Sequence, residues 1–246
     1  MDAATEGSAS SSLLGRLEIQ QRQQMMRSRR PCVKHFSHSH PLRPVEVKEE
    51  EELICSGCEL DLSGSAYRCR KSSSCCDDFY LHRSCFELPK VLQLPMDHVS
   101  GHQHPMLLLD TPPKEDDDDE YPKFVCNACG DYGTGFTYRC SSTSCQSFNL
   151  HVTCAFLPNT IKHVDHQHPL SLFSSSTSLD IKGISSSSSS SSIFTCDVCR
   201  KQVPQNCWIY YCSECDYGTD LACTTTTTTN NNTYSVLPAG GGGRIQ

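Results

Sequence analysis

The stretch from Phe124 to Ile161 decides how this chain folds. It contains the segments FVCNACG, GFTYRC and CQSFNLHVTCAFLP. These segments carry six side chains that can bind a metal ion: Cys126, Cys129, Cys140, Cys145, His151 and Cys154. A structural zinc site needs four thiolate or imidazole ligands, and two cysteines separated by two residues fit one tight turn whose sulfur atoms converge on the ion. The stretch therefore predicts a small metal-built unit with more ligands than one ion requires.

The same ligand blocks recur on both sides of this stretch. The upstream blocks contain Cys55, Cys58, Cys69, Cys75, Cys76, His82 and Cys85, and the downstream blocks contain Cys196, Cys199, Cys212, Cys215, Asp220 and Cys223. A His-x-His-Pro motif precedes each set, at residues 38–41, 102–105 and 166–169. Blocks that recur about every 60–70 residues indicate tandem structural repeats. We predict a first module over residues 35–98, a second over 99–163 and a third over 164–223.

Composition favours metal over disulfides as the source of stability. The chain has 18 Cys and 11 His, but only 37% of its residues are hydrophobic, and units of about 60 residues are marginal without metal or disulfides. No secretory signal opens the sequence, which predicts a reducing compartment, the cytoplasm and/or the nucleus. No apolar run is long enough for a transmembrane segment. The formal charge of −7 gives little non-specific attraction to nucleic acid.

The connecting segments are polar and of low complexity. Residues 1–34 are expected to form a flexible tail and residues 224–246, rich in Thr, Asn and Gly, a disordered one. An acidic run at Glu115–Glu120 and a Ser tract at Ser185–Ser192 are expected to be solvated or flexible loops.

The order His-Pro-Leu, Cys-x-x-Cys, Tyr-x-Cys, Cys, Phe-x-Leu-His-x-x-Cys, Leu-Pro resembles the plant cysteine/histidine-rich, divergent C1-like zinc-finger family. That family is distantly similar to the diacylglycerol-binding finger. The resemblance covers about residues 35–223 and weakens in the third module. It implies tandem repeats of small zinc-stabilised α+β modules, each with short β-hairpins, a short C-terminal helix and two interleaved Zn²⁺ sites.

The resemblance also implies a ligand set for each of the first two modules. The Cys-x-x-Cys pair joins the later His-x-x-Cys, and the flanking ligands form the other site. In the first module these sets are Cys55, Cys58, His82 and Cys85, and His40, Cys69, Cys76 and His98. In the second they are Cys126, Cys129, His151 and Cys154, and His104, Cys140, Cys145 and His163. His38 and His102 remain alternatives to His40 and His104, and Cys75 to Cys76.

The third module departs from the pattern. Asp220 replaces the histidine in the set Cys196, Cys199, Asp220 and Cys223. His168, Cys212 and Cys215 find no closing ligand after Cys223, although Cys207 is an alternative and His166 a rival of His168. We therefore expect two zinc ions in each of the first two modules and one or none in the third.

The motifs favour a binding protein over an enzyme. A catalytic zinc keeps an open coordination position, whereas the first two modules have enough ligands to close every site. The sequence has no Gly-rich phosphate loop and no His-Glu-x-x-His motif. Lipid binding is disfavoured because residues 59–64 and 130–135 are small and acidic. The resemblance implies an intracellular signalling or stress-response protein that binds unidentified protein partners. The alternatives are a nucleic-acid-binding or transcription-associated finger, and a disulfide reductase acting through its Cys-x-x-Cys pairs.

Overall fold

The computed structural model describes residues 31–71, 76, 78–94, 102–113, 121–145, 147–174 and 194–224. The expectations for residues 1–30, for Cys75 and His98, for the two inserted loops and for the tail after residue 224 lie outside these residues. The described chain belongs to two compact units, residues 1–53 with 61–86, and residues 54–60 with 87–246. No helix among the described residues is long and apolar enough to cross a membrane.

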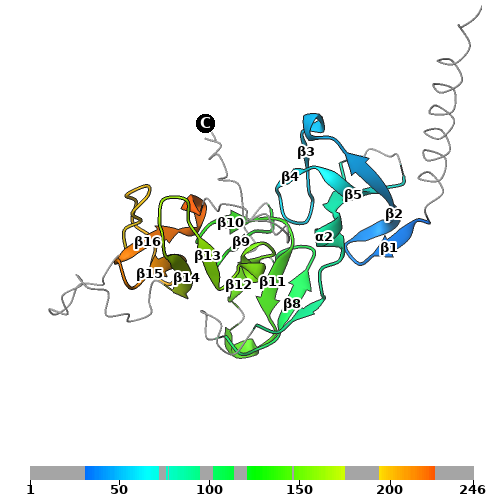
Figure 1. Ribbon diagram of the computed structural model, residues 1–246. Coiled ribbons are helices and arrows are strands. Elements are labelled where there is room, and N and C mark those ends of the chain that lie inside the picture. The colour runs from blue at the N-terminus through cyan, green and yellow to red at the C-terminus, as the bar shows by residue number, and fades with distance from the viewer. Residues whose placement is uncertain are drawn as a thin grey trace, which may run out of the picture. The chain divides into compact units, whose positions relative to one another are not determined.

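The first unit contains a four-stranded antiparallel sheet (Figure 1). Its strands are β1 (Val33–His35), β2 (His38–Val47), β5 (Gly64–Cys69) and β6 (Tyr80–His82), in that order. A 3₁₀ turn, η1 (Glu49–Glu51), follows β2, and β3 (Leu53–Ile54) pairs with β4 (Asp61–Leu62). Leu42, Ala66 and Leu81 are buried from three different strands. Since β1 begins at Val33, the last two residues of the expected tail, Val33 and Lys34, belong to this sheet.

The second unit contains two further sheets with the same strand order. One consists of β7 (Val91–Leu92), β8 (Met106–Leu109), β11 (Thr137–Cys140) and β12 (Asn149–His151). The other consists of β13 (Thr160–Lys162), β14 (Pro169–Ser174), β15 (Trp208–Cys212) and β16 (Tyr217–Asp220). A hairpin of β9 (Phe124–Val125) and β10 (Tyr132–Gly133) precedes β11. The repetition predicted from the sequence is therefore a repetition of one sheet.

The edge strand of each sheet in the second unit comes from the segment that follows a Leu-Pro pair. Tyr138 donates a hydrogen bond from its hydroxyl to the carbonyl of Pro89 at 2.8 Å, and Tyr210 donates the matching bond to Pro158 at 2.7 Å. Both tyrosine rings are completely buried. Residues 91–92 and 160–162 thus belong to the sheets of the second and third modules, ahead of the boundaries expected at residues 99 and 164.

Helix is scarce. A four-residue helix, α2 (Arg83–Phe86), follows β6 and is the only α-helix among the described residues. The matching positions in the other modules hold single 3₁₀ turns, η3 (Cys154–Phe156) and η4 (Leu221–Cys223), and η2 (Thr143–Cys145) is a further such turn. The modules are therefore small and β-rich, and the predicted C-terminal helix is reduced to about one turn.

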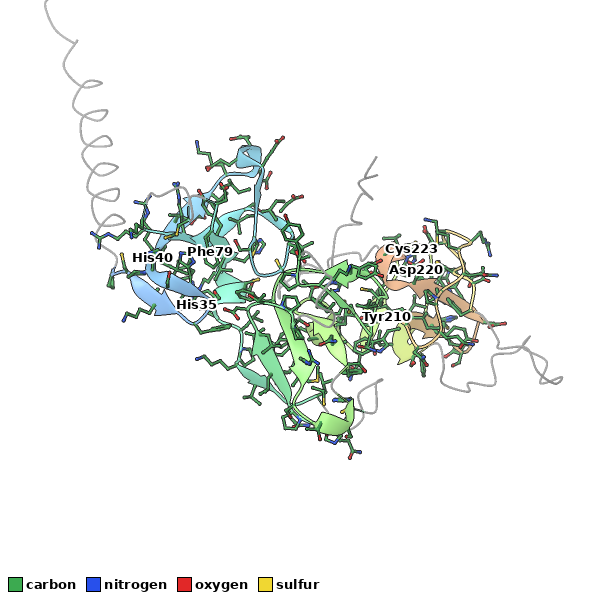
Figure 2. The ribbon with its side chains drawn as sticks, turned by 180° about the vertical axis from the view of Figure 1, so that it is seen from behind. His35, His40, Phe79, Tyr210, Asp220 and Cys223 are labelled. Atoms are coloured by element: carbon green, nitrogen blue, oxygen red, sulfur yellow. The ribbon has the colours of Figure 1, made fainter. Side chains whose placement is uncertain are left out.

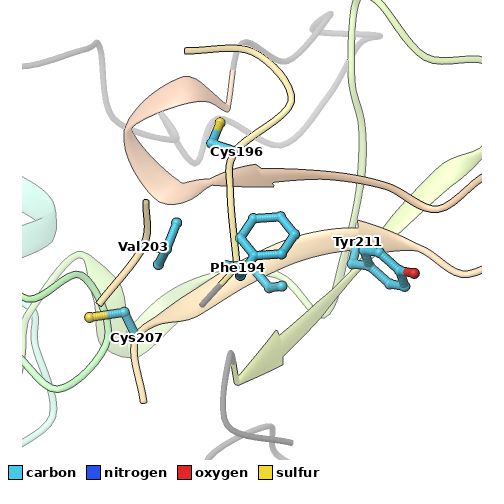
Figure 3. Packing of buried hydrophobic residues seen from close by; sticks show 6 residues of the cluster. Phe194, Cys196, Val203, Cys207 and Tyr211 are labelled. Atoms are coloured by element: carbon cyan, nitrogen blue, oxygen red, sulfur yellow. The ribbon is translucent and has the colours of Figure 1, made fainter. Parts of the chain in front are cut away.

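The third module has a compact apolar cluster. Phe194, Cys196, Val203, Cys207, Ile209 and Tyr211 are buried together (Figure 3). Burial raises the pKa of the Cys207 thiol to about 11, so this cysteine is protonated and packs as a small apolar side chain.

Candidate metal centres

The Cys-x-x-Cys turn of the second module places two thiols beside a histidine. Cys126 and Cys129 bracket a turn closed by hydrogen bonds from Cys126 N to Asp131 O at 2.9 Å and from Gly130 N to Cys126 O at 2.8 Å. His151 ends strand β12, and its Nδ1 lies 3.3 Å from Cys129 Sγ and 3.9 Å from Cys154 Sγ. The ligand atoms of these four residues all lie within 4.8 Å of one another. The strand end and the turn therefore converge on one point.

The pKa values of these four side chains depend strongly on one another. Burial raises the pKa of Cys126, but hydrogen bonds from Cys129, Cys154 and His151 outweigh burial and bring it below its ordinary value. Burial lowers the pKa of His151, because it disfavours the charged imidazolium, but the Cys126 and Cys129 thiolates raise this pKa to about 10. Hydrogen bonding with Cys126 and Cys129 raises the pKa of Cys154. Without a cation the thiols cannot all be deprotonated together, which is what a divalent metal ion would allow.

The first module repeats this arrangement. Cys55, Cys58, His82 and Cys85 form a group with the same separation limit of 4.8 Å. His82 donates a hydrogen bond from Nε2 to the carbonyl of Asp61 at 3.0 Å. This bond fixes the tautomer that leaves Nδ1 available for a metal ion.

The third module contains a carboxylate in the matching group. The Cys199 thiol donates to Asp220 Oδ2 at 3.1 Å, and Asp220 Oδ1 accepts from Cys223 N at 2.8 Å. Cys196 Sγ accepts from Asp220 N at 3.4 Å. Figure 2 shows Asp220 and Cys223 side by side. Burial raises the pKa of Asp220, but hydrogen bonds from the Cys199 and Cys223 thiols outweigh burial and bring it below its ordinary value.

This carboxylate should make the third Cys-x-x-Cys group weaker for zinc than its counterparts. Oxygen is a harder ligand than the imidazole nitrogen it replaces. We therefore expect Asp220→His to slow the release of zinc from this group to a chelator by on the order of tenfold. Chelator competition with a colorimetric zinc indicator measures the release, and Asp110→His, an exposed position outside the groups, is the matched control. Faster release from Asp220→His would contradict the assignment.

Each His-x-His motif contributes to a second group. These groups contain His38, His40, Cys69 and Cys76; His102, His104, Cys140 and Cys145; and His166, His168, Cys212 and Cys215. The second histidine of each motif approaches a thiol through Nδ1. His40 lies 3.2 Å from Cys76 Sγ, His104 lies 3.2 Å from Cys145 Sγ, and His168 lies 3.1 Å from Cys215 Sγ.

The first histidine of each motif is held by an aromatic ring. His38 stacks on Phe79 with ring centroids 4.1 Å apart, His102 on Phe148 at 4.2 Å and His166 on Tyr217 at 4.5 Å. Each aromatic residue stands three positions before His82, His151 or Asp220 of the other group. In each module, one short segment thus holds a histidine of the His-x-His group and supplies a ligand of the Cys-x-x-Cys group. The two groups of a module are therefore interleaved along the chain.

The buried nitrogen of this first histidine fits a metal ion. Nε2 of His38 and Nε2 of His166 are buried and have no hydrogen-bond partner among the described residues. Burial, and then the charge of His40, lowers the pKa of His38. A neutral imidazole with an unpaired buried nitrogen is suited to binding a metal ion. His38 shares its group with His40, Cys69 and Cys76, which are ligands of the kinds that zinc prefers.

The structure bears on three assignments based on the sequence. His98, expected to close the first module's second site, lies outside the described residues and stays a prediction, and His38 lies in that group with His40, Cys69 and Cys76. His163 does not join Cys140 and Cys145, because its Nε2 donates to the carbonyl of Cys223 at 3.1 Å and its Nδ1 accepts from Asp165 N at 3.2 Å. In the third module no closing ligand was expected after Cys223, and His166, a rival of His168 in the sequence, lies in one group with His168, Cys212 and Cys215.

The other predicted ligands are brought together as the resemblance implied. Five groups each bring four ligand atoms of the kinds that zinc binds within 4.8 Å of one another. In the third module's Cys-x-x-Cys group, hydrogen bonds join Asp220 to Cys196, Cys199 and Cys223. Sequence reasoning left His38, His102 and His166 only as rivals of their neighbours. The signal that identifies them is the recurrence of the whole His-x-His motif together with an aromatic residue three positions before each His or Asp ligand.

Comparison with known proteins agrees with this threefold architecture. The sequence model of a family described as C1 domain matches residues 36–86, 100–155 and 165–224. Each match contains one His-x-His motif and one complete set of Cys-x-x-Cys ligands. No curated protein and no solved structure matches the chain. The chain belongs to the C1 domain family, as three tandem copies of its divergent, cysteine- and histidine-rich form.

Proposed function

We propose that the chain is a non-catalytic interaction protein whose three modules each hold two structural zinc ions. The observation that supports this most is the supply of four protein ligands to each described group. A structural zinc site is closed by four protein ligands, whereas a catalytic one keeps a position for water or substrate. The proposed role is to present zinc-built surfaces to protein partners in the cytoplasm or nucleus, in signalling or a stress response.

Substitution of zinc by Co²⁺ tests whether the sites are closed. We expect intense visible absorption from tetrahedral thiolate coordination, unchanged when azide is added, because no ligand position is open to an anion. An absorption spectrum that shifts with azide would reveal an open site and contradict the non-catalytic role. Asp220→Ala serves as the control, since removing one ligand from the third Cys-x-x-Cys group should create an azide-sensitive site.

Protein binding is favoured over lipid binding by the state of two loops. The loops at residues 59–64 and 130–135 match those that insert into membranes in the diacylglycerol-binding finger. Here Glu59 accepts hydrogen bonds from the backbone N–H of Thr134 at 3.0 Å and from its hydroxyl. Phe136 N also donates to Gly57 O at 2.8 Å. Polar contacts therefore engage these two loops with each other, which does not suit insertion into a bilayer.

We expect the zinc-loaded chain to stay in the supernatant when sedimented with vesicles of phosphatidylcholine, phosphatidylserine and diacylglycerol. The same vesicles without diacylglycerol are the control for charge-driven adsorption. Pelleting that depends on diacylglycerol would overturn the preference for a protein partner.

A further inference from the structure

A backbone contact recurs between consecutive Cys-x-x-Cys turns and the strands that follow them. Phe136 N donates to Gly57 O at 2.8 Å, and Trp208 N donates to Ala128 O at 2.6 Å. Gly57 and Ala128 both stand directly before the second cysteine of a turn, and Phe136 and Trp208 both stand four residues before a ligand cysteine. The same docking contact therefore occurs twice within the second unit.

The residue before each donor shows how closely the turn approaches. A Cβ at Gly135 would lie 2.6 Å from the carbonyl oxygen of Gly57, closer than any real Cβ contact. At the other contact, a Cβ at Gly130 would lie 3.0 Å from Cys207 Sγ. The docked turn thus fills the space beside the start of the receiving strand.

The third turn has the geometry of the other two. Cys196 N donates to Lys201 O at 2.9 Å and Arg200 N to Cys196 O at 2.9 Å, matching the bonds at Cys126 and Gly130. Arg200 has a φ of 61°, and the matching residues Glu59 and Gly130 have 59° and 80°. Val198, which matches Gly57 and Ala128, is 42% exposed. The third turn therefore presents the docking surface with an exposed apolar side chain at its centre.

The matching edge in the first module is open. Gly64 and Ser65 occupy the positions of Gly135 and Phe136, and a Cβ built at Gly64 meets no atom of the described residues within 4 Å. Cys69 N donates to Phe79 O as Cys140 N does to Phe148 O. Because backbone groups alternate sides along a strand, Ser65 N points toward the same side of its sheet as Phe136 N, away from β2.

We propose that the third turn, Cys196–Cys199, docks on the Gly64–Ser65 edge of a second copy of this chain. The Val198 carbonyl accepts from Ser65 N, as the Gly57 and Ala128 carbonyls accept from Phe136 N and Trp208 N. The two surfaces differ, so the contact is head-to-tail and extends beyond a dimer unless it closes into a ring. This inference rests on the proposed zinc-built fold, because the metal ion holds the turn in shape.

Sedimentation velocity of the zinc-loaded full chain over a concentration series tests the contact. We expect the average mass to rise with concentration for the natural chain. Val198→Asp should weaken association by roughly tenfold or more, because it places a charge at the centre of the turn surface. Gly64→Asn should do the same at the receiving edge, since asparagine tolerates the φ of 74° at this residue but fills the open space.

A mixture of the two variants gives the sharper result. Val198→Asp keeps the receiving edge and Gly64→Asn keeps the turn, so the mixture should form dimers that cannot extend. Val91→Asp is the matched control, because Val91 is a comparably exposed valine, at 57%, on β7 away from the turns. A natural chain that stays monomeric, or a mixture that forms no dimer, would overturn the proposal. Zinc content and circular dichroism of the same samples show separately whether the zinc-built fold is intact.

Discussion

Removing zinc from the full chain is expected to unfold all three modules. The groups bury cysteines where a conventional domain would bury larger apolar side chains, with Cys55, Cys126 and Cys196 completely enclosed. A structural zinc ion contributes about 10–16 kcal/mol of binding free energy in finger peptides, compared with about 5–15 kcal/mol of net stability for a typical domain. Modules of this size with so little core cannot compensate for that loss.

Trp208 reports this loss directly, because it is the single tryptophan of the chain and is 2% exposed. A high-affinity chelator should shift its emission to longer wavelength and abolish the β signal in circular dichroism, and added zinc should restore both. A chelator that carries bound zinc is the control for direct effects of the reagent. An emission maximum unchanged after zinc has been removed would contradict a zinc-built fold.

Cys129→Ser is expected to disturb two modules, whereas Cys199→Ser should disturb one. Cys129 shapes the turn whose Ala128 carbonyl accepts from Trp208 N, and Cys207 packs beside Gly130 in the same turn. Loss of the ion that this turn binds therefore removes the support of strand β15. No matching contact on the third turn is found among the described residues of the second module, so the effect should run from the second module to the third.

Hydrogen exchange measured by mass spectrometry resolves this direction. In Cys129→Ser, amides of residues 137–151 and of residues 208–220 should both lose protection. In Cys199→Ser, only residues 208–220 should lose it, while residues 137–151 keep the protection seen in the natural chain. If both variants lost amide protection equally in residues 137–151 and 208–220, the second and third modules would depend on each other equally, which would contradict this prediction.

The threefold repetition and most of the ligands could be predicted from the sequence because short motifs carry them. A Cys-x-x-Cys pair determines its own turn, and His151 and Cys154 are three residues apart on one strand end and turn. The fourth ligand of the second site was harder to predict. His102 lies in this group together with His104, and it is held by stacking on Phe148, more than 40 residues away along the chain.

His163 shows the same limit of sequence reasoning. Its position suited a ligand of the second module, but strand β13 carries the chain into the third module's sheet immediately before it. The backbone then holds both of its ring nitrogens. The predicted short C-terminal helix amounts to a four-residue α-helix in the first module and to single 3₁₀ turns in the other two. The contacts between Cys-x-x-Cys turns and the strands that follow them are made by backbone groups, so no sequence motif predicts them.

The zinc content of the intact chain tests the central claim most directly. Native mass spectrometry of the full chain, prepared with excess zinc and then freed of loosely bound metal, should show six zinc ions, two for each C1 module. His166→Ala should reduce the count to five, because it removes one ligand from the third module's second group. A natural chain that holds four zinc ions, with a count unchanged by His166→Ala, would contradict the account.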